Sequence, residues 1–206
     1  MKSSPERYTA FSNQSLIAQG SLEELLSCLA EAREQDDTLS PLIFRDATGE
    51  PIEIDWRDPL SLQVSKIERE ESDAEPAQEP LPPRTGPGRP KLGVIAREVT
   101  LLPRHWEWLA SQPGGASVAL RKLVEAARKA NERADQARIS LEAAHRFMSL
   151  MGGDLPGFEA ASRALFAADF AQARREIRNW PEDLRRYAEA MMRKAEQFAL
   201  AARGEN

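Results

Sequence analysis

Short apolar segments separated by turns fill the N-terminal part of the chain. Four of these segments predict β-strands, at residues 8–11, 16–18, 42–44 and 52–56. The alternation Leu62-Val64-Ile67 adds one further candidate strand. Between the second and third strands, Ser21 can cap a helix whose buried stripe is Leu22, Leu25, Leu26 and Leu29. This order predicts a small ββαββ domain over residues 1–67.

The middle of the chain predicts a strand followed by two helices over residues 93–150. The strand is expected at residues 94–102, and Pro103 begins a short helix that buries Trp106 and Leu109, with Trp108 beside them. Ser117 is expected to cap the next helix, which runs to about residue 150. Its apolar residues form a heptad seam typical of coiled coils: Leu120, Leu123, Ala127, Ala130, Ala134, Ala137, Leu141, Ala144 and Met148.

Residues 151–206 predict a C-terminal helical hairpin. Pro156 begins a helix that carries apolar residues at helical spacing as far as Trp180, and Pro181 begins the last helix. With the N-terminal domain, this gives an α+β fold that ends in a long-helix bundle.

Residues 68–92 have a different composition from both flanking parts. An acidic run at residues 68–75 precedes six prolines. Such a segment buries too little apolar surface to offset the entropy of ordering it, so a disordered linker is predicted.

The charge is divided unevenly along the chain. The net charge of the 206 residues is −5, but residues 1–80 carry 7 basic and 18 acidic side chains, against 21 basic and 15 acidic in residues 81–206. This asymmetry favours contact between the C-terminal part and a polyanion.

The apolar pattern also bears on the compartment. No run approaches the ~20 apolar residues of a membrane span, and the first residues lack the apolar core of a secretory signal. A cytoplasmic protein without membrane contact is therefore expected. The single cysteine, Cys28, lies among leucines and is expected to be a buried, inert thiol.

The end of the linker holds a basic arm, Pro87-Gly88-Arg89-Pro90-Lys91. Its Gly-Arg-Pro core resembles an AT-hook, although Pro87 stands where that motif usually has a basic residue. The resemblance implies that Arg89 lies along the minor groove of A·T-rich DNA and that Arg84 and Lys91 contact phosphates. The alternative interpretation is a proline-rich linker that is basic by chance.

The segment after the arm resembles the ribbon-helix-helix family over about 35 residues. The resemblance rests on Val99-Thr100-Leu101, Pro103, the Gly114-Gly115 break and the run from Ala119 to Val124. In that family two chains pair their strands, the paired ribbon enters the major groove, and the second helix binds phosphate at its N-terminus. The resemblance implies a homodimer, with phosphate contacts from Gly115, Ser117, Arg121 and Lys122.

The strand departs from that family's usual pattern. Thr100 is the only outward residue suited to base edges, and Arg97 reaches them only if the strand bulges. A helical hairpin entered by a short strand, with no DNA role, is the alternative interpretation.

Catalysis has little support in the sequence. His105 and His145 lie on different predicted helices, and neither has a Cys or second His at metal-ligand spacing. Gly-x-Ser-x-Gly and P-loop motifs do not occur. We therefore expect a protein that is not an enzyme and that has no metal and no cofactor.

The chain as a whole resembles a bacterial family known as a domain of unknown function. The likeness rests on the block from Gly88 to Val124, the hairpin Leu42-Ile43-Phe44…Thr48-Gly49, and the segments Gly153-Asp154-Leu155-Pro156-Gly157-Phe158 and Trp180-Pro181-Glu182. It implies a cytosolic bacterial protein and no particular activity. The residues favour a homodimeric DNA-binding protein, such as a transcriptional regulator. The alternative is a non-enzymatic interaction or scaffold protein, and residues 1–67 are a candidate site for a protein partner in either case.

Overall fold

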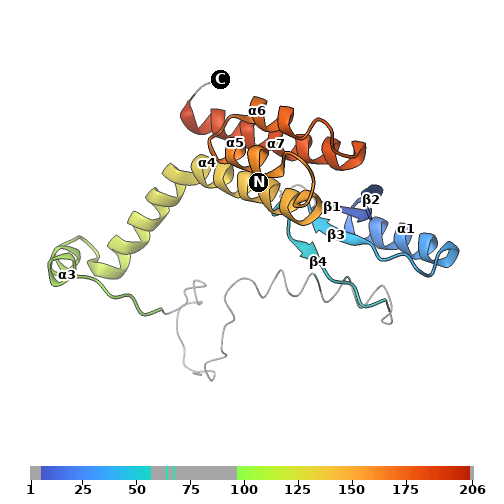
Figure 1. Ribbon diagram of the computed structural model, residues 1–206. Helices are drawn as coiled ribbons and strands as arrows, with labels where there is room; N and C mark the ends of the chain where they lie inside the picture. Colours follow the sequence, from blue (N-terminus) through green and yellow to red (C-terminus); the bar gives the residue numbers. More distant parts are fainter. Residues whose placement is uncertain (1–5, 57–63, 65–66, 68–96, 205–206) are drawn as a thin grey trace, which may run out of the picture. The chain divides into compact units, whose positions relative to one another are not determined.

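The computed structural model describes residues 6–56, 64, 67 and 97–204 (Figure 1). The chain divides into two compact units, one of residues 1–64 and 131–206 and one of residues 65–130. Helix α4 (Gly115–Gly152) contributes residues to both. The linker predicted at residues 68–92 lies outside the described residues.

The first unit begins with a four-stranded antiparallel sheet. Its strands are β1 (Tyr8–Ser12), β2 (Ser15–Gly20), β3 (Leu42–Arg45) and β4 (Pro51–Ile52), in the order β2-β1-β3-β4. The predicted fourth strand, residues 52–56, is wrong in extent, because pairing ends at Ile52. Pro51 has no N–H to donate to the ladder, which suits it only to a short edge strand. Val64 and Ile67, expected in a further strand, are helical.

Helix α1 (Leu22–Gln35) follows the sheet's first hairpin as predicted. Ser21 and Glu24 form a capping box, in which each side chain accepts a hydrogen bond from the other residue's backbone N–H. The four leucines of the predicted stripe are buried. Cys28 is exposed, which corrects the expectation of a buried thiol. At about 100° per residue, Cys28 lies roughly 110° from the centre of the leucine stripe.

The C-terminal helices lie along the second half of α4 (Figure 1). They are α5 (Phe158–Phe166), α6 (Phe170–Glu176) and α7 (Glu182–Arg203). The start of α7 after Pro181 is confirmed, but the single helix predicted from Pro156 to Trp180 is wrong. Ala168 has a left-handed φ of 57°, which ends α5, and the Asp169 side chain accepts from Gln172 N–H to cap α6.

One hydrophobic core joins the sheet to these helices. The ring of Phe147 on α4 lies 5.4 Å from Phe11, 5.2 Å from Phe44 and 4.6 Å from Tyr187, between ring centroids. We expected separate domains at residues 1–67 and 151–206, whereas Phe11 and Phe44 of the sheet share one cluster with α4, α5, α6 and α7. Gly49 permits the close approach of the β3–β4 turn, because a Cβ there would lie 2.4 Å from the Ala143 carbonyl oxygen.

The second unit contains α3 (Pro103–Ala110) and the first turns of α4. Leu109 is buried as predicted, at 3% exposure, but Trp106 and Trp108 are 41% and 51% exposed. The expectation that α3 buries Trp106 is therefore wrong. Leu109 projects roughly 60° from Trp106 and 100° from Trp108 around the helix, so a helix with one narrow buried line leaves both indoles outside.

The α+β class predicted from the sequence is confirmed by the sheet and the helices that follow it. None of the described helices combines the length and apolar character that a bilayer crossing requires.

Candidate functional site

The basic arm forms the first part of the predicted site. Arg84, Arg89 and Lys91 lie outside the described residues. Their contact with a DNA groove stays a prediction from the sequence.

The predicted ribbon strand, residues 94–102, is described only over residues 97–102. This part contains no strand, although Leu102 has an extended backbone with φ −66° and ψ 149°. Arg97 and Thr100 are both exposed there. An extended backbone becomes a strand only when its N–H and C=O groups pair with a neighbour, so the sequence pattern of a strand does not by itself produce one.

The start of α4 is built on two glycines. Gly114 and Gly115 have φ angles of 87° and 75°, in the left-handed region that favours glycine. The Gly115 N–H donates to the Gln112 carbonyl at 3.0 Å, so this predicted phosphate donor already has a partner. Ser117 lies within the first turn rather than before it, because α4 begins at Gly115. The expected capping role of Ser117 is therefore wrong.

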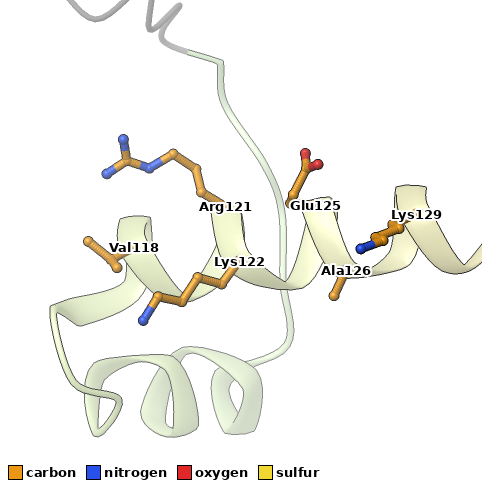
Figure 2. A pocket seen from close by; sticks show the side chains of 6 residues that line it. All are labelled: Val118, Arg121, Lys122, Glu125, Ala126 and Lys129. Carbon is orange, nitrogen blue, oxygen red and sulfur yellow. The ribbon is translucent and has the colours of Figure 1, made fainter. Parts of the chain in front are cut away.

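A groove of about 560 Å³ follows along α4 (Figure 2). Its lining residues recur at intervals of one and three along the helix, which keeps them on one side: Val118, Arg121, Lys122, Glu125, Ala126 and Lys129. The structure thus places Arg121 and Lys122 together on one surface. It adds Lys129, which does not belong to the site predicted from the sequence.

The electrostatics of this groove are dominated by cations. The Arg128 guanidinium pairs with Glu125 at 2.8 Å, and this hydrogen bond lowers the pKa of the Glu125 carboxyl. Among the described residues, no carboxylate lies within ion-pair distance of Arg121, Lys122 or Lys129. Residues 97–130 hold six basic and three acidic side chains, so this segment attracts anions.

Arg121 is partly held in place by its own helix. Its Nε donates to the Ser117 carbonyl at 3.2 Å, which leaves the two terminal nitrogens of the guanidinium for a ligand. Lys122 and Lys129 are exposed and seven residues apart, so they lie about two turns from each other on the same side. The seven-residue spacing of Lys122 and Lys129 is the signal in the sequence that could have indicated Lys129.

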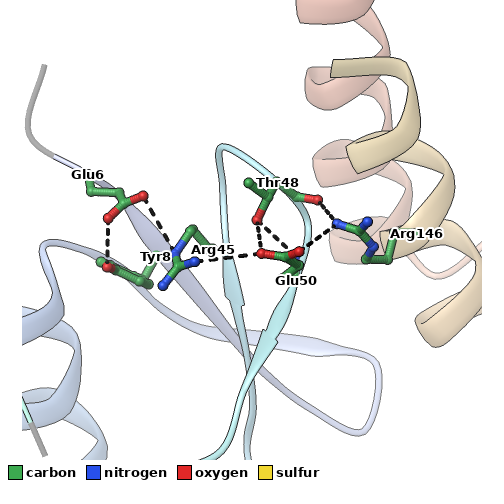
Figure 3. A network of polar contacts seen from close by, with 6 residues as sticks. All are labelled: Glu6, Tyr8, Arg45, Thr48, Glu50 and Arg146. Atoms are coloured by element: carbon green, nitrogen blue, oxygen red, sulfur yellow. Dashed lines mark hydrogen bonds and ion pairs between the residues drawn. The ribbon is translucent and has the colours of Figure 1, made fainter. Parts of the chain in front are cut away.

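Two polar networks in the first unit serve a different purpose. Arg45 contacts Glu6 and Glu50, and Arg146 of α4 donates to the Thr48 carbonyl and lies 3.5 Å from Glu50 (Figure 3). These pairs are structural contacts that connect the sheet to α4.

The second network surrounds Asp46. Its carboxylate accepts hydrogen bonds from the hydroxyls of Thr9 and Tyr187, each at 2.6 Å, and from Gln19 at 3.2 Å. Burial, with the nearby Asp46 charge, raises the pKa of the Tyr187 phenol well above its ordinary range. Tyr187 is therefore a proton-retaining donor that joins α7 to the sheet.

The two histidines lie on different helices, His105 on α3 and His145 on α4. His145 packs its ring 4.8 Å from that of Phe166 and 6.2 Å from that of Phe158, between centroids, and His105 is exposed on α3. Within the described ranges, no cluster of three His, Cys, Asp or Glu residues could hold a metal ion.

Comparison with known proteins gives a family and no activity. No curated protein and no solved structure matches the chain. A family described as "Uncharacterized protein conserved in bacteria (DUF2239)" matches residues 7–192. Because this match spans most of the 206 residues, the chain belongs to that bacterial family.

Proposed function

We propose that the protein binds DNA through the groove on α4 together with the basic arm that precedes α3. The observation that carries the proposal is a set of three exposed cations on one side of a helix, Arg121, Lys122 and Lys129, which have no carboxylate partner in the part of the chain that the structure describes. Solvated surface lysines and arginines with nearby carboxylates are common and need no ligand. Cations gathered on one groove suit a phosphate backbone.

The contact falls on side chains rather than on the N-terminus of α4. The Gly115 N–H is already bonded to Gln112, which removes one of the donors that a phosphate at the helix end would need. Arg121 and Lys122 lie further along the helix and present charge directly. Arg84, Arg89 and Lys91 would add minor-groove and phosphate contacts with an A·T preference.

Homodimerisation is the finer part of the proposal. Two chains that pair residues 94–101 as a ribbon would bring two basic arms to one duplex and double the number of phosphate contacts. A dimer of this kind fits a bacterial regulator acting in the cytoplasm. Sedimentation should then give about twice the 23.0 kDa of one chain.

The test is duplex binding measured at several salt concentrations. One variant replaces Arg84, Arg89 and Lys91 with alanine, and a second combines Arg121→Ala with Lys122→Ala. Each lost phosphate contact should reduce the slope of log affinity against log salt by about 1, with weaker binding at low salt. The arm variant should also lose any preference for A·T-rich over G·C-rich duplexes.

A matched control removes one arginine and one lysine elsewhere. Arg163 and Lys194 are exposed residues of the other unit, so Arg163→Ala with Lys194→Ala changes net charge by the same amount as the α4 variant. If the control and the α4 variant lower affinity equally, the effect is one of overall charge and the proposed site is wrong.

The alternative function is a protein scaffold. It is favoured by Leu123 and Val124, which are 48% and 63% exposed on α4 and offer apolar surface to a protein partner. A scaffold would bind no duplex at low salt, and both basic variants would behave as the wild type does.

A further inference from the structure

Two half-exposed tryptophans on α3 are not explained by the packing of the second unit. Trp106 and Trp108 are 41% and 51% exposed, whereas Trp180 of the first unit is 5% exposed. An indole is a large apolar group, and folding normally encloses most of it. Helix α3 uses Leu109 for its own packing, at 3% exposure, and leaves both indoles in solvent.

The tryptophans and the cations belong to the same compact unit. Helix α3 lies beside the first turns of α4, and residues 111–114 join the two helices (Figures 1 and 2). The groove on α4 begins at Val118, and Arg121 is the first of its cations. Exposed aromatic faces therefore occur in the same short stretch of structure as cations that lack a carboxylate partner among residues 6–56, 64, 67 and 97–204.

Exposed indoles next to cations favour one class of ligand over others. A cation groove favours a polyanion over a neutral protein surface, and an exposed indole favours a ligand with flat, unsatisfied ring faces. In duplex DNA the base faces are covered by their neighbours in the stack, so an indole gains little from them. In a single strand the bases are able to unstack and lie on an aromatic side chain.

We propose that the second unit binds a single-stranded stretch of nucleic acid, with bases stacked on Trp106 or Trp108 and phosphates held by Arg121, Lys122 and Lys129. This inference rests on the proposed nucleic-acid function and names the form of the ligand. Base–aromatic stacking tolerates any sequence, because every base has a π-face. The site therefore prefers unpaired strands over duplexes rather than one sequence over another.

The two indoles do not contribute equally. Residues two apart on a helix project about 200° from each other, so Trp106 and Trp108 lie on opposite sides of Leu109. A single strand held by the groove cations is therefore expected to stack on one of the two indoles rather than on both. Single substitutions should therefore differ in effect.

The experiment uses the full chain and a labelled thymine strand of about sixteen nucleotides, with a matched A·T duplex for comparison. Trp106→Ala or Trp108→Ala should weaken binding to the strand by about five-fold or more, while duplex affinity stays unchanged. Trp106→Phe or Trp108→Phe at the sensitive position should restore most of the affinity. Addition of the strand should also quench tryptophan fluorescence in the wild type.

Phe166→Ala is the matched control, because Phe166 is 56% exposed on a helix of the other unit. It should leave strand binding unchanged. Strand affinity that is the same in both tryptophan variants as in the wild type would overturn the inference. A tryptophan variant that sediments with a different mass from the wild type, but binds the strand with the same affinity, would also overturn it. In that case a second copy of the chain would be covering the indoles.

The two proposals fail separately. A wild type that binds the duplex but not the strand overturns the single-strand site and leaves the duplex proposal in place. A wild type that binds neither form overturns both. A wild type that binds the strand through one tryptophan supports the inference even if the arm variant changes nothing.

Discussion

The apolar seam runs along both halves of α4, but the large apolar side chains of the two halves differ in how far other elements cover them. Phe147 and Met148 in the second half are fully buried beneath the sheet and α7, whereas Leu123 and Val124 in the first half are 48% and 63% exposed. Arg133, near the middle of α4, donates to the Ala201 carbonyl near the end of α7. The contact with α7 therefore extends along the second half of α4 as far back as Arg133. The heptad seam marks a helix face suited to packing, but cover depends on which other elements reach it.

The difference between the two halves separates stability from binding. The buried half holds the first unit together through aromatic contacts, and its substitution should affect folding. The exposed half carries the cationic groove, and substitutions there should affect ligand binding. The predictions below test this separation, from the largest expected effect to the smallest.

The largest expected effect comes from Phe147→Ala. Removal of a fully buried phenylalanine should lower the free energy of unfolding by about 3–5 kcal/mol, because three neighbouring rings lose their partner. Val124→Ala, on the exposed half, should change it by less than about 0.5 kcal/mol. Urea unfolding followed by circular dichroism measures both. Phe147→Leu provides a milder change if the alanine variant does not fold, and equal stability of all three variants with the wild type would contradict the shared core.

Tyr187→Phe should have an intermediate effect. It removes the hydroxyl that donates to Asp46 at 2.6 Å, and the loss of a hydrogen bond to a carboxylate should cost about 1.5–3 kcal/mol. Thr9 and Gln19 still donate to Asp46, which favours the lower end of this range. Thr38→Val, which removes an exposed hydroxyl bonded to Asp36, is the control and should change stability little.

Tyr187 should also make the free energy of unfolding depend on pH in the alkaline range. Burial and the nearby Asp46 charge raise the pKa of Tyr187 in the folded state above the ordinary tyrosine value of about 10, so its contribution to stability is fully present below about pH 10 and is lost as the pH rises above it. The unfolding free energy of the wild type should therefore fall more steeply above pH 10 than that of Tyr187→Phe. Parallel curves for the two proteins would mean that the phenol is not buried as described.

The smallest expected effect is a change in nucleic-acid affinity when a residue of the groove is substituted. Glu125→Gln removes the one carboxylate that lines the groove and should strengthen binding to a nucleic acid slightly, because it reduces repulsion of phosphate. Stability should not change measurably, since the Glu125–Arg128 pair is exposed. Glu159→Gln, which removes a similar exposed pair with Arg163 in the first unit, should leave binding unchanged. An equal gain from both variants would point to net charge alone.

Local chemistry made some elements predictable. Ser21 and Glu24 stand at the spacing of a capping box, and the start of α1 follows from these two side chains and the leucines after them. The long helix was predicted from residues 117 to 150 and runs from Gly115 to Gly152, because its apolar spacing persists over many turns. For the candidate site, the sequence identified Arg121 and Lys122 but neither Lys129 nor the exposure of the two tryptophans on α3.

Other features were decided only in three dimensions. The break at Ala168 depends on a left-handed backbone that alanine rarely adopts, and nothing in the apolar spacing around it indicates the break. The shared core depends on Phe11 and Phe44 meeting Phe147, more than a hundred residues later in the chain. Periodicity along the chain specifies which face of each element is apolar, since side-chain direction follows backbone geometry. Which apolar faces meet, and which stay exposed to a ligand, depends on contacts between distant residues that no local pattern contains.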